Sequence, residues 1–312
     1  MSRLNNSRRS VLRKDNLLGV GITNEREEDI LEYLLLSLKQ SKDKVFIVTP
    51  NPEILVYAYN HPAYKKILNE ARIVLPDGVG VFLASLFMGK PFRERIPGVD
   101  FIETLCRECV NKPISMGFLG GRGGVAKRTA ECLMKRYPWI KVRYVGEGWE
   151  EDFKFKDRVN KTKKDNGSDI DKYSMRGLSA AYPKGTSYNV AAPYISKDDP
   201  IDILFVAFGF PKQEEWIAEN LETLPVRAAM GVGGAFDYIS GSVRRAPFLV
   251  RAIGFEWLFR LIKEPWRFRR QLALLVFIWL FVKEQFGFGN LRLRRKGQFV
   301  ETSQKVRRGK NG

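Results

Sequence analysis

The stretch Val45-Phe-Ile-Val-Thr-Pro-Asn-Pro52 joins a short apolar strand to the start of a helix. Four consecutive apolar residues are typical of a strand that is buried on both faces, as in a parallel sheet. Asn51 can cap the following helix, and Pro52 suits its first position because the first turn leaves that N–H unpaired anyway. A strand that leads directly into a helix predicts a β–α unit.

The same order of elements recurs along the chain. Further strand segments are predicted at 72–75, 114–119, 141–145, 203–208 and 227–232, with helical patterns between most of them. Six strands of this kind predict an α/β fold, a Rossmann-like and mostly parallel sheet with helices on both faces. Ligands of such sheets bind at the carboxyl ends of the strands, so polar residues at those ends are the candidates for a functional site.

A carboxylate follows the strand predicted at 72–75. Asp77 stands in Leu75-Pro-Asp-Gly-Val79, where it could accept a proton from a hydroxyl nucleophile. Asp-Gly is also common in turns and caps, which is the simpler interpretation of this motif alone. Thr49 and Asn51 allow the same two interpretations, because either side chain can hydrogen-bond a sugar or phosphate, or can cap a helix.

Glycine-rich turns follow other strands. Gly120 and Gly121 belong to Gly117-Phe-Leu-Gly-Gly-Arg-Gly-Gly124, whose amides could hold a phosphate at a helix N-terminus. The loop lacks the Gly-x-Gly-x-x-Gly spacing and the acidic residue that follows it in dinucleotide-binding folds, which argues against a nicotinamide cofactor. Two later turns add Gln213, in Gly209-Phe-Pro-Lys-Gln-Glu-Glu-Trp216, and both Gly233 and Asp237, in Gly231-Val-Gly-Gly-Ala-Phe-Asp237.

Positive charge gathers in the C-terminal part of the chain. Residues 241–312 hold 17 Lys and Arg against four Glu, which is +13 of the formal net charge of +18. They also hold three tryptophans and the apolar run Leu272 to Val282. As a helix this run would be about 16 Å long, against roughly 30 Å of bilayer hydrocarbon, so it cannot span. Basic residues beside aromatic and apolar ones predict a segment that lies on an anionic membrane.

These patterns divide the chain into a basic tail at 1–18, a Rossmann-like core at 19–240 and a basic, aromatic, membrane-associating appendage at 241–312. Residues 161–200 are rich in Lys, Asp, Ser and Gly without periodicity, which predicts a flexible insertion in the core. The single histidine, His61, excludes a Ser-His-Asp triad and any multi-histidine metal site.

Five motifs, in this order, resemble those of the WecG/TagA/CpsF family of bacterial glycosyltransferases. They are Thr49-Pro-Asn-Pro-Glu53, Leu75-Pro-Asp-Gly-Val79, Arg95-Ile-Pro-Gly98, Gly209-Phe-Pro-Lys-Gln-Glu214 and Gly231-Val-Gly-Gly-Ala-Phe-Asp237. The resemblance implies an inverting, metal-independent enzyme without a cofactor. Such an enzyme moves a sugar, here expected to be N-acetylmannosamine, from a UDP-sugar to a polyprenyl-diphosphate-linked acceptor in cell-surface polysaccharide or teichoic-acid synthesis.

The resemblance also implies roles for single residues. Asp77 matches the proposed catalytic base, and Arg95 matches an arginine that could stabilise charge on the departing UDP. The substrate-binding candidates are Thr49, Asn51, Gln213 and Asp237, together with the glycines Gly120, Gly121 and Gly233. The C-terminal Arg260, Arg267 and Arg270 match arginines thought to complete the site around a diphosphate. These three are also explained as plain interfacial charge, and both interpretations stay open.

We expect the partners to be a UDP-sugar, the lipid-linked acceptor and an anionic membrane on its cytoplasmic face, and not nucleic acid; a homo-oligomer is also possible. Another UDP-hexose or uronic acid is an alternative donor, because no motif here distinguishes these sugars. A nucleotide-binding oxidoreductase and a basic nucleic-acid-binding protein are alternatives from other classes. The missing ribose-binding acid argues against the first, and the lack of a recognised DNA- or RNA-reading motif argues against the second.

Overall fold

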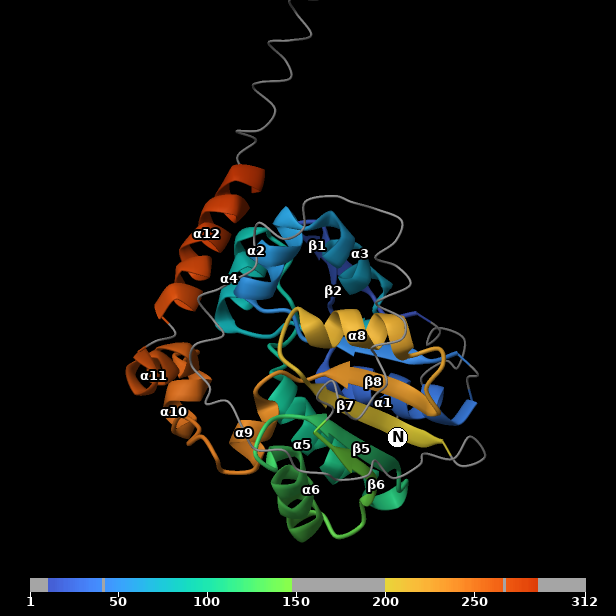
Figure 1. Ribbon diagram of the computed structural model, residues 1–312. Coiled ribbons are helices and arrows are strands. Elements are labelled where there is room, and N and C mark those ends of the chain that lie inside the picture. The colour runs from blue at the N-terminus through green and yellow to red at the C-terminus, as the bar shows by residue number, and fades with distance from the viewer. Residues whose placement is uncertain (1–10, 41–42, 148–199, 266–267, 286–312) are drawn as a thin grey trace, which may run out of the picture.

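The computed structural model describes residues 11–40, 43–147, 200–265 and 268–285. Its main sheet has six parallel strands in the order β4-β3-β8-β7-β5-β6 (Figure 1). The strands are β3 (Val45–Val48), β4 (Ile73–Val74), β5 (Ser115–Gly120), β6 (Lys141–Gly146), β7 (Ile201–Ala207) and β8 (Val226–Gly231). All six lie where the sequence predicts strands, so the α/β fold is confirmed. Nearly all of the insertion predicted at 161–200 lies outside the described residues.

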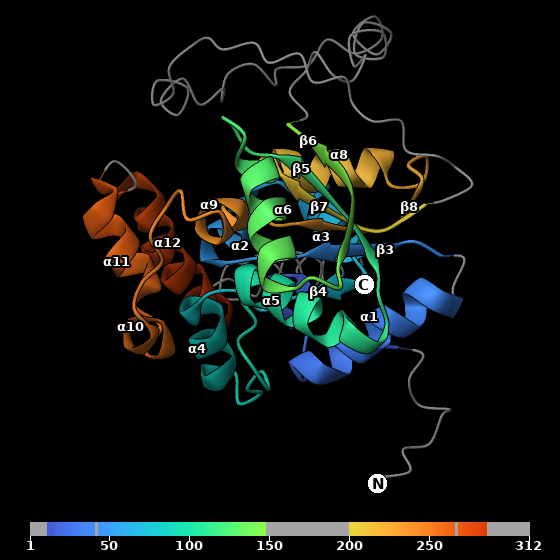
Figure 2. The ribbon, with the colours of Figure 1, turned by 90° about the horizontal axis from the view of Figure 1, so that it is seen from below.

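Helices cover both faces of this sheet (Figure 2). One face is covered by α1 (Glu27–Gln40), α5 (Gly98–Glu108), α6 (Val125–Arg136) and α9 (Ala235–Ile239), with a 3-10 turn at Cys109–Asn111 after α5. The other is covered by α2 (Pro52–Asn60), α3 (Pro62–Glu70), α4 (Val79–Phe87), α8 (Lys212–Asn220) and α12 (Phe268–Gln285). Side chains of a strand alternate between faces, so Ile47 joins the first core cluster and Val48 the second.

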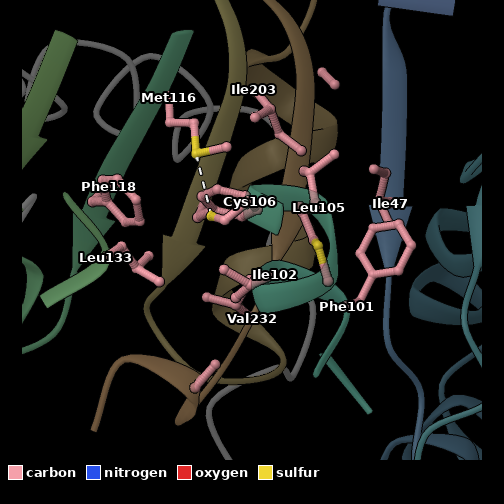
Figure 3. Close-up of a cluster of buried hydrophobic side chains, with 14 of the residues drawn as sticks. Ile47, Phe101, Ile102, Leu105, Cys106, Met116, Phe118, Leu133, Ile203 and Val232 are labelled. Atoms are coloured by element: carbon pink, nitrogen blue, oxygen red, sulfur yellow. Dashed lines mark hydrogen bonds between the residues drawn. The ribbon is translucent and has the colours of Figure 1, made fainter. Parts of the chain in front are cut away.

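The first core cluster packs α5 against the sheet. Figure 3 shows Phe101, Leu105 and Cys106 of this helix among side chains of the strands. The Cys106 sulfur lies 3.8 Å from the sulfur of Met116. Cys106 and Cys109 are buried free thiols whose pKa values are raised by burial, so both serve as core residues.

A hairpin precedes the first helix and was not predicted. It pairs β1 (Lys14–Leu17) with β2 (Val20–Thr23) in antiparallel fashion. Leu17 and Ile22 are buried in the second core cluster. The hairpin therefore crosses the boundary at residue 18 that we expected between the basic tail and the core.

Three helices at the C-terminal end lie beside the carboxyl ends of the strands, next to α4 and α9 (Figures 1 and 2). They are α10 (Phe248–Ala252), α11 (Glu256–Lys263) and α12. The face of α12 that carries Phe277, Leu280 and Phe281 belongs to the second core cluster. By contrast, neither α10 nor α11 contains a buried residue. Within the described ranges, no helix is long and apolar enough to cross a membrane.

Candidate active site

The loops that follow four neighbouring strands meet at the carboxyl-terminal edge of the sheet. Asp77 follows β4, Thr49 follows β3, Gly233 follows β8 and Gly209 follows β7. Adjacent strands are about 4.8 Å apart, so these four strand ends span roughly 14 Å. The loop after β7 leads to α8 on one face, and the loop after β8 leads to α9 on the other. Ligands of parallel sheets bind where neighbouring loops diverge in this way.

Asp77 lies in a charged and partly buried environment. The pKa of its carboxyl is raised to about 7, mainly by burial; the positive charge of Arg95 opposes this rise, and the negative charges of Glu256 and Asp100 add to it. The backbone amide of Gly98 also hydrogen-bonds this carboxyl and lowers its pKa. A carboxylate with a pKa near neutrality can both hold and release a proton at physiological pH, as a general base must.

Arg95 connects this carboxylate to the C-terminal helices. Its Nη2 donates a hydrogen bond of 2.9 Å to the backbone carbonyl of Arg251, in α10. The side chain therefore lies between the loop after β4 and the C-terminal part of the chain. The structure thus brings Arg95 to Asp77, 18 residues earlier in the chain, as the shared motif pattern led us to expect.

Thr49 and Asn51 make contacts within the protein. The Thr49 hydroxyl is buried and donates to the carbonyl of Gly231 at 3.3 Å, which ties the end of β3 to the end of β8. Asn51 caps α2, because its side-chain oxygen accepts from the amide of Ile54 at 3.1 Å. The capping interpretation of Asn51 is therefore confirmed, while contact with a substrate stays a prediction for both residues.

Gln213 is buried and braces two loops of the site. Its side-chain oxygen accepts from the amide of Gly233 at 2.9 Å and from the amide of Gly209 at 3.2 Å. Its side-chain nitrogen donates to Glu214 at 2.7 Å. Gln213 thus fixes the loops after β7 and β8 to each other. Nothing lies within 4 Å of the position that a Cβ would occupy at Gly209 or at Gly233, so both loops leave room for a ligand.

Two backbone amides of the glycine-rich loop after β5 donate hydrogen bonds within the protein. The amide of Gly121 donates to the carbonyl of Ala207 at 3.1 Å. The amide of Gly124, at the start of α6, donates to the Glu147 carboxylate at 2.6 Å. Gly120 is required by packing, because its φ is +102° and a Cβ there would lie 2.8 Å from the backbone of Ala207. A substrate-binding role for Gly120 and Gly121 therefore remains a prediction.

Arg260 of α11 reaches the same edge of the sheet. Its guanidinium stacks on the ring of Tyr238, 4.9 Å from the ring centroid, and its Nε donates to Glu264 at 3.1 Å. The Arg260 guanidinium and the Asp237 carboxylate both lie next to Gly234. Arg267 lies outside the described residues, as does the side chain of Arg270. Of the three arginines expected to cluster, the structure therefore describes the side chain of Arg260 alone.

A comparison with protein families identifies the family of this chain. The model of the glycosyl transferase WecG/TagA/CpsF family matches residues 15–166 and 194–290. This chain belongs to that family.

Curated relatives of this glycosyltransferase carry one activity in their names. A protein from Bacillus spizizenii is 32% identical over 248 residues, which cover 80% of this chain and 82% of the relative. A protein from Staphylococcus aureus is 28% identical over 286 residues, which cover 88% of this chain and 94% of the relative. Both are named N-acetylglucosaminyldiphosphoundecaprenol N-acetyl-beta-D-mannosaminyltransferase.

The candidate site also contains residues that sequence reasoning missed. Glu214 is buried beside Gln213, and burial raises the pKa of its carboxyl to about 7. Asp100 and Glu256 act on Asp77 electrostatically, and both bind Arg245. Glu214 was within reach of the sequence, because it lies inside a quoted motif. Asp100, Glu256 and Arg245 lie outside every motif, and nothing in the sequence around them indicates a role.

Proposed function

We propose that this enzyme transfers N-acetylmannosamine from UDP-N-acetylmannosamine to N-acetylglucosamine carried on undecaprenyl diphosphate. Membership of the family and the shared name of the relatives support the donor sugar and the acceptor. The observation that carries the mechanism is the Asp77 carboxyl, which has a pKa of about 7 and lies at a strand end beside Arg95.

Asp77 acts as the general base in this proposal. Its carboxylate takes the proton of the acceptor hydroxyl as that oxygen forms a bond to the anomeric carbon of the donor. The bond from this carbon to the diphosphate breaks at the same time, and its electron pair leaves with UDP. Attack on the side opposite to the leaving group inverts the anomeric centre.

Positive charge and backbone dipoles stabilise the departing diphosphate in this scheme. Arg95 and Arg260 are the described candidates, since both guanidinium groups lie at the edge of the sheet that holds Asp77. Preorganised donors of this kind stabilise developing negative charge in a site that excludes water. Arg267 and Arg270 are proposed to join them.

The prenyl tail of the acceptor stays in a bilayer, so we propose that the enzyme binds the membrane surface. Large apolar side chains are exposed on α4, α10, α11 and α12. We call them the outer apolar face: Phe87, Phe248, Leu249, Ile253, Ile262, Phe268, Leu275 and Trp279, each between 60% and 79% exposed. Lys283 lies 5.1 Å from the ring of Trp279, which pairs a cation with an aromatic residue as membrane interfaces favour.

The Asp77→Asn variant tests this function, because it keeps the shape of the side chain and removes the base. With UDP-N-acetylmannosamine and a short-chain lipid-diphosphate N-acetylglucosamine acceptor, product formation measured by mass spectrometry should fall by roughly 10²-fold or more. The affinity for UDP, measured by calorimetry, should change little. An Asp77→Asn enzyme with wild-type turnover would refute the assignment of the base.

A further inference from the structure

The helices α10 and α11 adjoin the catalytic carboxylate without a fully buried side chain. Some of their apolar residues, such as Trp257 and Phe259, are half-buried, while others are largely exposed, as the 75% exposure of Leu249 and the 69% exposure of Ile262 illustrate. Yet they lie close to the core, because a Cβ at Gly254 would lie 2.6 Å from the side chain of Val79, two residues after Asp77. Polar contacts must therefore supply much of what holds these two helices in place.

Arg245 makes the most extensive of the described polar contacts at this seam. Its Nη1 and Nη2 donate to the two carboxylate oxygens of Asp100, in α5, at 2.6 and 2.9 Å. Its Nε donates to Glu256, in the first turn of α11, at 3.0 Å. The side chains of Arg245 and Glu256 are only 18% and 19% exposed. The bidentate partner Asp100 is 39% exposed. Two parallel hydrogen bonds and a partly buried second partner fix geometry far better than a single exposed ion pair.

We propose that Arg245 is a positioning residue that latches α11 onto α5 and so keeps the C-terminal helices closed over Asp77. The proposal rests on the role of Asp77 as the base in the proposed function. In this role Arg245 lies between the core and the C-terminal helices and touches neither the donor nor the acceptor.

The latch acts through the surroundings of Asp77. The charged groups that face this carboxyl are Arg95 from the loop before α5, Asp100 from α5 and Glu256 from α11. Burial has the largest effect on the pKa of Asp77. If α11 detaches, water reaches Asp77 and the negative charge of Glu256 moves away. Both changes lower the pKa of Asp77 toward its ordinary value. If Arg245 merely screened Asp100 and Glu256, its loss would raise the pKa instead.

The test compares Arg245→Met with Arg244→Met in the full-length enzyme. Arg244 is the exposed neighbour, so its variant removes the same charge without touching the latch. In Arg245→Met we expect faster amide hydrogen exchange over 256–263 and an acidic limb of the kcat–pH profile that moves to lower pH. We also expect a kcat about tenfold lower, because detachment of α11 withdraws Arg260 from the departing diphosphate and lets water reach Asp77. Arg244→Met should resemble the wild type in all of these.

A second variant opens the latch from the core side. Asp100→Asn removes the bidentate partner without changing the C-terminal helices, and it should reproduce the faster exchange over 256–263. Exchange is the readout for this variant, because loss of the Asp100 charge lowers the pKa of Asp77 by itself. An Arg245→Met enzyme whose limb stays in place, or moves up while α11 stays protected, would overturn the proposal. Failure of the base is recognised separately, because Asp77→Asn would then keep its activity whatever Arg245 does.

Discussion

The guanidinium of Arg95 donates to the main-chain carbonyl of Arg251 at 2.9 Å, and so ties the loop beside the candidate base to the C-terminal helices. The same guanidinium lowers the pKa of Asp77, against the effect of burial. One side chain thus contributes to the charge of the site and to its closure.

Replacing Arg95 by Met should raise the pKa of Asp77, because the opposing positive charge is lost. The base is active when ionised, so the acidic limb of the kcat/KM–pH profile should move to higher pH, and activity at pH 7 should fall. Arg93→Met is the matched control, since that side chain is about half exposed and its Nε lies 3.8 Å from Glu25. Equal profiles for the two variants would show that Arg95 does not act on the base.

The carboxyl of Asp77 should destabilise the fold at alkaline pH. Its pKa of about 7 in the folded protein exceeds the ordinary value of 3.8, so ionisation favours the unfolded chain increasingly between these two pH values and fully above pH 7. Asp77→Asn should therefore raise the free energy of unfolding by up to about 4 kcal/mol at pH 8 and by little near pH 4. Urea denaturation at both pH values measures this, and an equal gain at both would contradict the raised pKa.

Gln213→Met should loosen two loops of the site together. The substitution leaves the amides of Gly209 and Gly233 and the carboxylate of Glu214 without their described partner, at a cost of roughly 3 kcal/mol. Denaturant titration measures the loss, and UDP affinity should fall with it. Lys212→Met is the control, because Lys212 is exposed and precedes Gln213 in the same helix. A stable Gln213→Met protein would mean that these bonds are dispensable.

Alanine at Gly120 should be far more damaging than alanine at Gly123. Both glycines have a positive φ, of +102° and +63°, but only at Gly120 would the new Cβ meet backbone, 2.8 Å from Ala207. Gly123→Ala should cost about 1 kcal/mol, the ordinary strain of a left-handed residue, and Gly120→Ala several times that. Thermal denaturation of the pair tests this difference, and similar melting temperatures would exclude the tight packing between β5 and β7.

Polar substitution on the outer apolar face should weaken membrane binding without unfolding the protein. Ile262→Asn removes a side chain that is 69% exposed, so its effect on stability should be small. Sedimentation with anionic vesicles should show a clear loss of bound protein. Met134→Asn is the control, because Met134 is 40% exposed on α6, outside this face. Equal losses for both variants would mean that apolar exposure alone, rather than this face, governs binding.

The strands, and the polar motifs at their carboxyl ends, could be predicted from the sequence because their signals are local. Val45–Val48 is a continuous apolar run followed by a capping Asn and a Pro, and the structure has the strand and the cap where this order places them. Once the strands are known to be parallel, their polar ends must share one edge, so Asp77 and Gly209 could be placed there without coordinates.

The latch and the brace could not be predicted, because their contacts join distant parts of the chain. Arg245 and Asp100 are 145 residues apart, and Gln213 and Gly233 are 20 apart in different loops. An arginine followed by apolar residues indicates basic charge and nothing about its partner. The hairpin β1–β2 could not be predicted for a different reason. Its strands have only four residues each and lie beside several arginines, so this part of the sequence indicates a basic tail.

The two-sided packing of α12 bears on how this protein can be dissected. Phe277 and Leu280 close one end of a core cluster, while Leu275 and Trp279 on the same helix are largely exposed. Cutting the chain at Gly241 would remove the buried Phe277 and Phe281, each worth roughly 3–5 kcal/mol, and would expose the apolar side chains against which they pack, so the remaining fragment would be unstable and prone to aggregate. The proposed membrane binding must therefore be tested by single substitutions on the exposed side of α12, with its buried side left unchanged.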